Sequence, residues 1–179
     1  SIGGLAFSPN GKRLAVAHKN GVSLWWAAAT EQNPVMLNWQ GSHLLTCWSP
    51  DGKMVLTAMQ ESALHGWRLS DMNEMRMQGY PGRIYNLAWA RGRWLVTSGA
   101  AQAVCWPFFG GGPWGKAPQP LGLDRGVIVR WAQPHPRDDL VAVGYADGMI
   151  ELAPLDGRPG VMIHPPVAPT GPGCPSVCC

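Results

Sequence analysis

The sequence predicts an all-β chain built from four related units, and three recurring segments support this prediction. The first segment ends in an aromatic residue and a turn: residues 5–12 (LAFSPNGK) recur as residues 46–53 (TCWSPDGK), with weaker copies at 87–93 and 129–136. The aromatic anchors of the four copies lie 41, 41 and 42 residues apart, and they are Phe7, Trp48, Trp89 and Trp131. A fixed period of this length is typical of repeat folds.

Two further segments recur in phase with the first. A short apolar run occupies 14–17, 55–58, 95–98 and 141–144. A third run ends in Trp at 22–25, 64–67 and 103–106, and its fourth copy at 149–152 has Leu152 in the Trp position. Apolar runs this short, bounded by turn residues, predict strands.

The segments between these runs contain residues that favour tight turns. In the Ser-Pro-Asn/Asp-Gly tetrapeptides, Pro presets φ and Gly supplies a positive φ, so each predicts a tight turn. Asn20-Gly21 and Asp147-Gly148 are two-residue hairpin signals between the second and third runs. We therefore expect antiparallel hairpins within each unit.

Composition excludes several classes of protein. No apolar run is long enough for a membrane helix, so no membrane partner is expected. The formal charge of +3 is too small to indicate nucleic acid. Of the five Cys, Cys47 and Cys105 fall inside predicted strands and the other three lie in the tail. This distribution does not indicate a framework of disulfide bonds. A reducing compartment is favoured, so we expect a cytoplasmic protein.

A period near 40 with room for four strands per unit is the signature of a β-propeller. On the aromatic–Ser-Pro-Asp-Gly motif, the Asn/Asp-Gly turn and the Trp-ending strand, the chain resembles the WD40-repeat family, bacterial members included. It departs from the pattern too. The Trp residues at 25, 67 and 106 are not followed by Asp, and Gly-His survives only as Gly41-Ser42-His43. We therefore expect the family's polar network of His, Asp and Trp to be mostly absent, with sheet packing holding the blades.

The resemblance implies an all-β, partial β-propeller of four WD40-like four-stranded antiparallel blades, an incomplete part of a seven- or eight-bladed ring. Residues 1–163 form this propeller fragment, with blades at about 1–40, 41–80, 81–124 and 125–163. Residues 107–122 are expected to form a long outer loop or an irregular fourth strand, with Trp114 packing back on the rim. The Pro-, Gly- and Cys-rich tail, 164–179, is expected to be disordered. The start at Ser1 without a Met indicates a fragment or a processed product.

The resemblance also implies a non-catalytic scaffold that binds other proteins and the remaining blades of the ring. The loops on one face of a propeller usually make such contacts, and Tyr and Arg concentrate binding energy. The predicted partner-binding residues are Tyr80, Arg83, Arg125, Tyr145, His18, Lys19, Gln60 and Glu61. Lys12, Arg13, Lys53, Arg91, Arg93 and Arg137 gather on the opposite face, where solvated hairpin tips are the favoured interpretation over a basic patch.

Two alternatives stay open. One is a propeller-fold hydrolase, which would need tuned polar side chains at the channel mouth. The other is a metal-responsive protein acting through the tail, where His164 accompanies Cys174, Cys178 and Cys179. That Cys spacing is not a standard zinc pair. The sequence therefore predicts no catalytic residue, no cofactor and no metal site.

Overall fold

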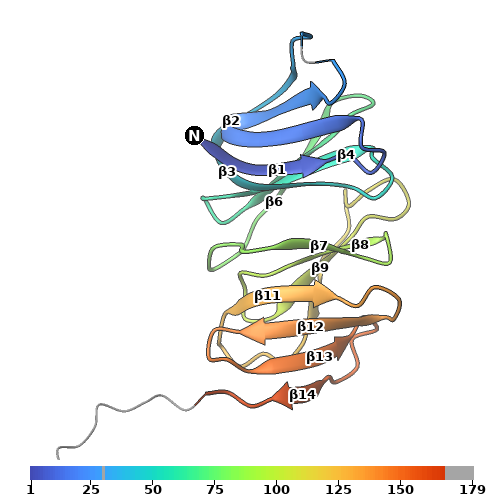
Figure 1. Ribbon diagram of the computed structural model, residues 1–179. Helices are drawn as coiled ribbons and strands as arrows, with labels where there is room; N and C mark the ends of the chain where they lie inside the picture. The colour runs from blue at the N-terminus through green and yellow to red at the C-terminus, as the bar shows by residue number, and fades with distance from the viewer. Residues whose placement is uncertain (30, 168–179) are drawn as a thin grey trace, which may run out of the picture.

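The computed structural model describes residues 1–29 and 31–167, and within them it contains fourteen β-strands and no helix (Figure 1). The strands form three antiparallel sheets of six, four and four strands, so the predicted all-β class is confirmed. The strands are β1 (Ile2–Phe7), β2 (Arg13–Trp26), β3 (Val35–Trp48), β4 (Met54–Met59), β5 (Leu64–Arg68), β6 (Asn73–Met77), β7 (Leu87–Ala90), β8 (Trp94–Thr97), β9 (Ala103–Pro107), β10 (Gln119–Leu121), β11 (Val129–Pro134), β12 (Leu140–Tyr145), β13 (Ile150–Pro154) and β14 (Val161–His164).

Strand β2 doubles back on itself. The backbone N–H of Ala27 donates to the carbonyl oxygen of Lys12 across 3.0 Å, although these residues flank opposite ends of the strand. A straight strand of this length would hold its ends roughly 45 Å apart. The chain must therefore reverse inside β2, as the Asn-Gly pair predicts, and Asn20 has a positive φ of 68°.

Strand β3 joins two parts of the six-stranded sheet. Its first half pairs with the returning half of β2, where Val35 lies opposite Leu24. Its second half pairs with β4, where Trp48 lies opposite Val55. The six-stranded sheet therefore consists of two four-stranded units that share one long strand, and the predicted boundary between residues 40 and 41 lies inside that strand.

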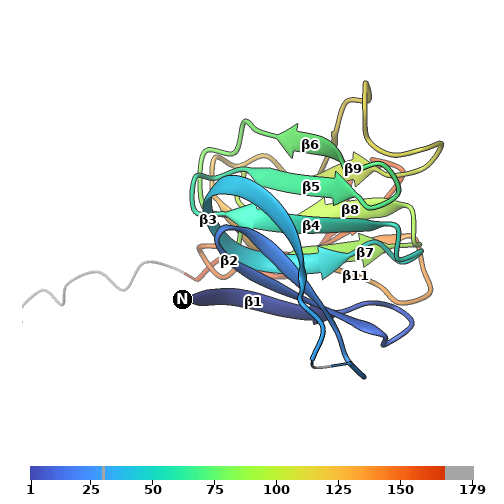
Figure 2. The same ribbon diagram turned by 90° about the horizontal axis from the view of Figure 1, so that it is seen from above.

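The other two sheets are four-stranded meanders, β7 to β10 and β11 to β14. In Figure 1 the units are stacked from the first unit, with β1 and β2, at the top to β14 at the bottom, and in Figure 2, seen from above, they lie over one another. Residues 108–118 form the expected irregular connection before the short strand β10. Trp114 packs back as predicted: its Nε1 donates to the Glu74 carbonyl oxygen at 3.2 Å, and the Arg68 guanidinium lies 4.6 Å from its ring centroid.

Backbone hydrogen bonds place equivalent residues of the units in register. The N–H groups of Ser8, Ser49 and His135 donate to the first residue of the next strand at 2.8, 2.9 and 2.8 Å. The residue before each is Phe7, Trp48 and Pro134. The prediction that Trp131 is the fourth anchor is therefore wrong by three residues.

Trp131 lies instead next to a strand irregularity and pairs with Gly144. The same register shift follows Ile2 in β1 and His43 in β3. The turn after β11 spans residues 135–139 and is as long as the turns after β1 (8–12) and β3 (49–53). Matching aromatic side chains misaligned the fourth unit because Pro134 occupies its anchor position, whereas the nearest aromatic residue is Trp131.

The third segment needs a similar correction in the fourth unit. The N–H of Leu69 donates to the carbonyl of Lys53, and the N–H of Leu155 donates to that of Asp139, both at 2.9 Å. Two residues earlier lie Trp67 and Ala153, so Ala153, not Leu152, takes the Trp position. The second segment was aligned correctly, because Val55 pairs with Trp48 as Val141 pairs with Pro134.

The core lies between successive units, in three clusters. The first joins units one and two around Leu24, Leu37, Trp48 and Trp67, the second joins units two and three around Leu56, Leu64, Leu95 and Trp106, and the third joins units three and four around Val96, Cys105, Val141 and Val143. Burying one large apolar side chain stabilises the fold by about 2–3 kcal/mol. Stacking of sheet faces therefore supplies most of the stability.

Backbones also approach closely where the first two units meet. A Cβ placed on Gly3 would lie 2.0 Å from the carbonyl oxygen of His43. Only glycine fits there, although its φ is not in the left-handed region. At Gly11 the reason for glycine is different: φ is 70° in the first predicted turn, and no atom lies near the Cβ position.

Candidate functional site

One edge of the stack collects the loops that carry all eight predicted partner-binding residues, at the left in Figure 1. Backbone hydrogen bonds join neighbouring loops: the N–H of Gln60 donates to the Ser42 carbonyl at 2.9 Å, and that of Gly82 to the Gly99 carbonyl at 3.1 Å. The loops therefore form one continuous surface, called the loop edge below. On it, Lys19, Gln60, Glu61, Arg83 and Arg125 are exposed and His18 is half-buried, whereas Tyr80 and Tyr145 are buried.

Tyr80 is an interior residue, so the prediction that it contacts a partner is wrong. Its side chain is only 9% exposed. The hydroxyl lies 2.7 Å from Thr97 Oγ1 and accepts a hydrogen bond from Trp106 Nε1 at 2.6 Å. Burial raises the pKa of Tyr80 to about 12, so the phenol stays protonated. The side chain links β8 and β9 to the segment that leads into the third unit.

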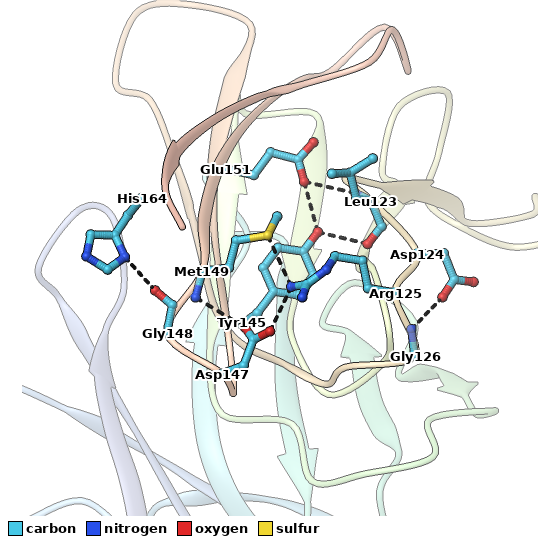
Figure 3. A network of polar contacts seen from close by, with 10 residues as sticks. All are labelled: Leu123, Asp124, Arg125, Gly126, Tyr145, Asp147, Gly148, Met149, Glu151 and His164. Atoms are coloured by element: carbon cyan, nitrogen blue, oxygen red, sulfur yellow. Dashed lines mark hydrogen bonds and ion pairs between the residues drawn. The ribbon is translucent and has the colours of Figure 1, made fainter. Parts of the chain in front are cut away.

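Tyr145 is buried as well and belongs to the polar network in Figure 3. Its hydroxyl lies 2.9 Å from the Leu123 carbonyl oxygen and 2.9 Å from Glu151 Oε2. Burial and the neighbouring Glu151 carboxylate raise the pKa of Tyr145. The same Oε2 accepts the N–H of Leu123 at 2.9 Å. The pair therefore holds the loop after β10 against β12 and β13, and the prediction of a partner contact at Tyr145 is also wrong.

Arg125 lies at the surface of this network. Its Nη1 is 2.8 Å from Asp147 Oδ2, and its guanidinium lies 5.9 Å from the Tyr145 ring centroid (Figure 3). Asp147 also accepts the N–H of Met149 at 3.2 Å, which fixes the predicted Asp-Gly turn. Burial alone would raise the pKa of Asp147, but the Met149 N–H and Arg125 together lower it. Arg125 is therefore partly neutralised by its own chain.

Two buried histidines lie behind the loop edge, between units one and two. His43 Nδ1 is 2.7 Å from Thr57 Oγ1, and Nε2 is 3.0 Å from the Trp39 carbonyl oxygen. The His65 ring stacks on Trp39 with centroids 4.0 Å apart, and neither ring nitrogen has a hydrogen-bond partner among the described residues. Burial lowers the pKa of both groups, that of His65 to about 3. Both rings are neutral at pH 7.

These contacts are polar links within the units, but they join His to Thr and Tyr to Thr and Trp, so they are not the network of His, Asp and Trp that is expected to be mostly absent. The His43–Thr57 pair occurs in unit two, and Tyr80 bridges Thr97 and Trp106 in unit three. The two threonines are equivalent, because each lies two residues beyond the position paired with Trp48 or Trp89. A Tyr hydroxyl replaces the imidazole in unit three, and the sequence motif does not anticipate that replacement.

An open depression of about 860 Å³ lies on the loop edge next to the buried histidines. Its lining combines amide, aromatic and cationic groups: Lys19, Asn20, Asn38, Trp39, Gln40 and Arg76. The guanidinium of Arg76 lies 5.9 Å from the Trp39 ring centroid. Of these residues the sequence prediction included only Lys19. Trp39 and Arg76 come from β3 and β6, which are far apart in sequence, so no local motif could have joined them.

The opposite edge bears the six predicted basic residues, but several have partners there. Arg91 Nε lies 3.0 Å from Asp139 Oδ1, and Lys53 Nζ lies 3.9 Å from Asp51 Oδ2. The Arg13 guanidinium lies 4.7 Å from the Trp26 ring centroid. The positive charge is therefore spread over separate local contacts.

Several groups that could react are buried, and the described residues contain no metal-binding cluster. The His43–Thr57 pair is buried, so no substrate reaches its hydroxyl. Burial raises the pKa of the Cys47 and Cys105 thiols to about 12, which keeps them protonated and unreactive. Across 1–29 and 31–167, no three His, Cys, Asp or Glu side chains group closely enough to hold a metal ion. The tail residues Cys174, Cys178 and Cys179 lie outside the described residues.

Comparison with protein-family models and with curated proteins finds no match for this chain. In the described part of the chain, no helix is long and apolar enough to cross a membrane.

Proposed function

We propose that the chain is a run of four WD40-type propeller blades whose loop edge binds another protein without catalysing a reaction. The observation that carries this proposal is the loop edge itself. It gathers exposed polar and charged side chains from all four units on a scaffold of stacked sheets. Binding residues are commonly placed on loops that a rigid scaffold positions.

The repeated geometry supports the propeller part of the proposal. Each unit is a four-stranded antiparallel meander, and the first strands of units one, two and four carry the same register shift. Radial repetition of such sheets is the construction of a propeller. The His–Thr and Tyr–Thr–Trp contacts stand where the WD40 resemblance places polar links within blades.

The charge of the loop edge that is free of ion pairs is mostly positive, although Glu61 and Asp124 are also exposed there, and it favours an acidic partner segment. Lys19, Arg76 and Arg83 are exposed, and none of them forms an ion pair with another described residue, whereas Arg125 is paired with Asp147. Lys19 and Arg76 flank Trp39 in the depression, which suits an extended peptide with a carboxylate beside an apolar group. Reducing conditions and a cytoplasmic location fit this proposal.

The test begins with capture of partners from the source cells on the tagged full chain, followed by identification and purification. The affinity of each purified partner is then measured for the wild type and for the double variant Lys19→Glu/Arg83→Glu. Charge reversal should weaken binding at least about tenfold and alter its salt dependence. Lys12→Glu on the opposite edge is the matched control and should leave affinity unchanged. If every partner binds the double variant as tightly as the wild type, the loop edge is not the binding surface.

A further inference from the structure

Each internal junction of the stack buries an apolar row on one sheet face. In unit two this row is Trp48, Val55 and Trp67, and it lies against the sheet of unit one, including Ala15 and Leu24. Trp48 is 6% exposed and Trp67 is 1% exposed. The row is therefore the surface by which a unit contacts the unit before it.

Unit one has the same row, and no other described residues cover it. Phe7 pairs with Leu14 as Trp48 pairs with Val55, and Trp25 precedes the Ala27–Lys12 hydrogen bond by two residues, as Trp67 precedes its equivalent. Yet Phe7 is 64% exposed and Trp25 is 39% exposed. We call this surface, with the neighbouring exposed Leu5 and Met36, the leading face. The first unit thus carries the contact row of an internal unit.

Unit four, the last unit of the described residues, has a face of the other kind that no other part of residues 1–29 and 31–167 covers. Its inner side, with Val141 and Val143, packs on unit three. The outer side bears Trp131 (54% exposed), Val161 (66% exposed) and the exposed Ile150. In unit two the equivalent side, with Leu56 and Ala58, is buried against unit three. We call the outer side of unit four the trailing face.

We propose that the trailing face of one copy of this chain binds the leading face of a second copy, head to tail. The contact would continue the stacking that the chain already makes at its three internal junctions. One chain presents both halves of that contact. The leading and trailing faces consist of apolar and neutral polar side chains. Their contact would therefore bury no unpaired charged group.

Contiguous exposed apolar side chains on a sheet face typically mark contact sites. A head-to-tail contact uses two different surfaces, unlike a two-fold contact, which joins a surface to itself. This difference makes the proposal testable with surface variants. It does not depend on the propeller assignment or on the identity of a loop-edge partner.

The experiment measures the mass of the full chain by sedimentation velocity over a wide range of concentrations. Phe7→Glu blocks the leading face and Val161→Glu blocks the trailing face. Met72→Glu, at an exposed position in the turn between β5 and β6, is the control on neither face. Far-UV circular dichroism and the urea midpoint verify folding, and Leu5→Glu replaces Phe7→Glu if that variant unfolds.

The wild type and Met72→Glu should associate, and each face variant alone should be monomeric. An equimolar mixture of Phe7→Glu and Val161→Glu should form a one-to-one heterodimer, because one intact face of each kind remains. A wild type that stays monomeric at every concentration would overturn the proposal. A face variant that still self-associates, or a mixture that stays monomeric, would overturn it as well, because either result requires a different contact.

Discussion

Acidification should unfold this protein largely through His65. The buried ring has a pKa of about 3, against 6.5 for an unperturbed imidazole, because burial disfavours the charged form and His43 and Arg76 repel it. The unfolded chain therefore takes up the proton first as the pH falls. The stability contributed by neutral His65 is complete above pH 6.5 and is lost between pH 6.5 and about 3.

The magnitude follows from the shift. Each pH unit below 6.5 costs about 1.4 kcal/mol, so at pH 5 the folded state has lost about 2 kcal/mol through His65 alone. His43 acts in the same direction, since burial lowers its pKa too, although the nearby Glu61 carboxylate opposes the shift. The Trp39 carbonyl oxygen, which accepts a hydrogen bond from His43 Nε2, opposes the shift as well.

The assay compares urea unfolding, followed by tryptophan fluorescence, at about pH 7.5 and pH 5. The variant to compare is His65→Val. Valine is chosen because Val104 occupies the equivalent position in unit three, where it pairs with Thr97 as His65 pairs with Thr57. His65→Val loses the stack on Trp39 but also removes two unpaired buried nitrogens, so its stability at neutral pH should change little. Its loss between the two pH values should be about 2 kcal/mol smaller than that of the wild type. Equal losses in both proteins would refute the reasoning, and His135→Gln, at an exposed site, controls for a surface histidine.

Three further predictions concern the packing of the units and are read from urea midpoints. Tyr80→Phe should cost about 1–3 kcal/mol, because the indole N–H of Trp106 loses its acceptor inside the core; no change would mean that water replaces the hydroxyl. Asn86→Ala should cost about 2 kcal/mol, since its amide bonds both backbone groups of one residue of β11 across the junction of units three and four; a neutral result would show that this junction does not need the bridge. Gly3→Ala should be more damaging than Gly11→Ala, which should cost only about 1 kcal/mol for its positive φ; the reverse order would contradict the close approach of units one and two.

The site illustrates the limits of a one-dimensional pattern. Loop positions could be predicted, because turn residues and strand period determine which residues fall between strands. Burial could not: Tyr80 and Tyr145 follow turn signals, yet their rings point inward to hydroxyl partners on other strands. The residues that line the depression could not be predicted from the sequence either, because Trp39 and Arg76 come together only when β3 and β6 take their places in the fold.

The sequence by itself determined the all-β class, the four units and their turns, because strand alternation and turn conformations depend on neighbouring residues. Only the tertiary structure decided the register of the fourth unit, in which Pro134 rather than Trp131 is the equivalent of Trp48. It also decided which apolar rows are covered. Phe7 and Trp48 have the same local pattern, and one is exposed while the other is buried. That difference arises from whether another sheet lies against the row, which no local pattern encodes.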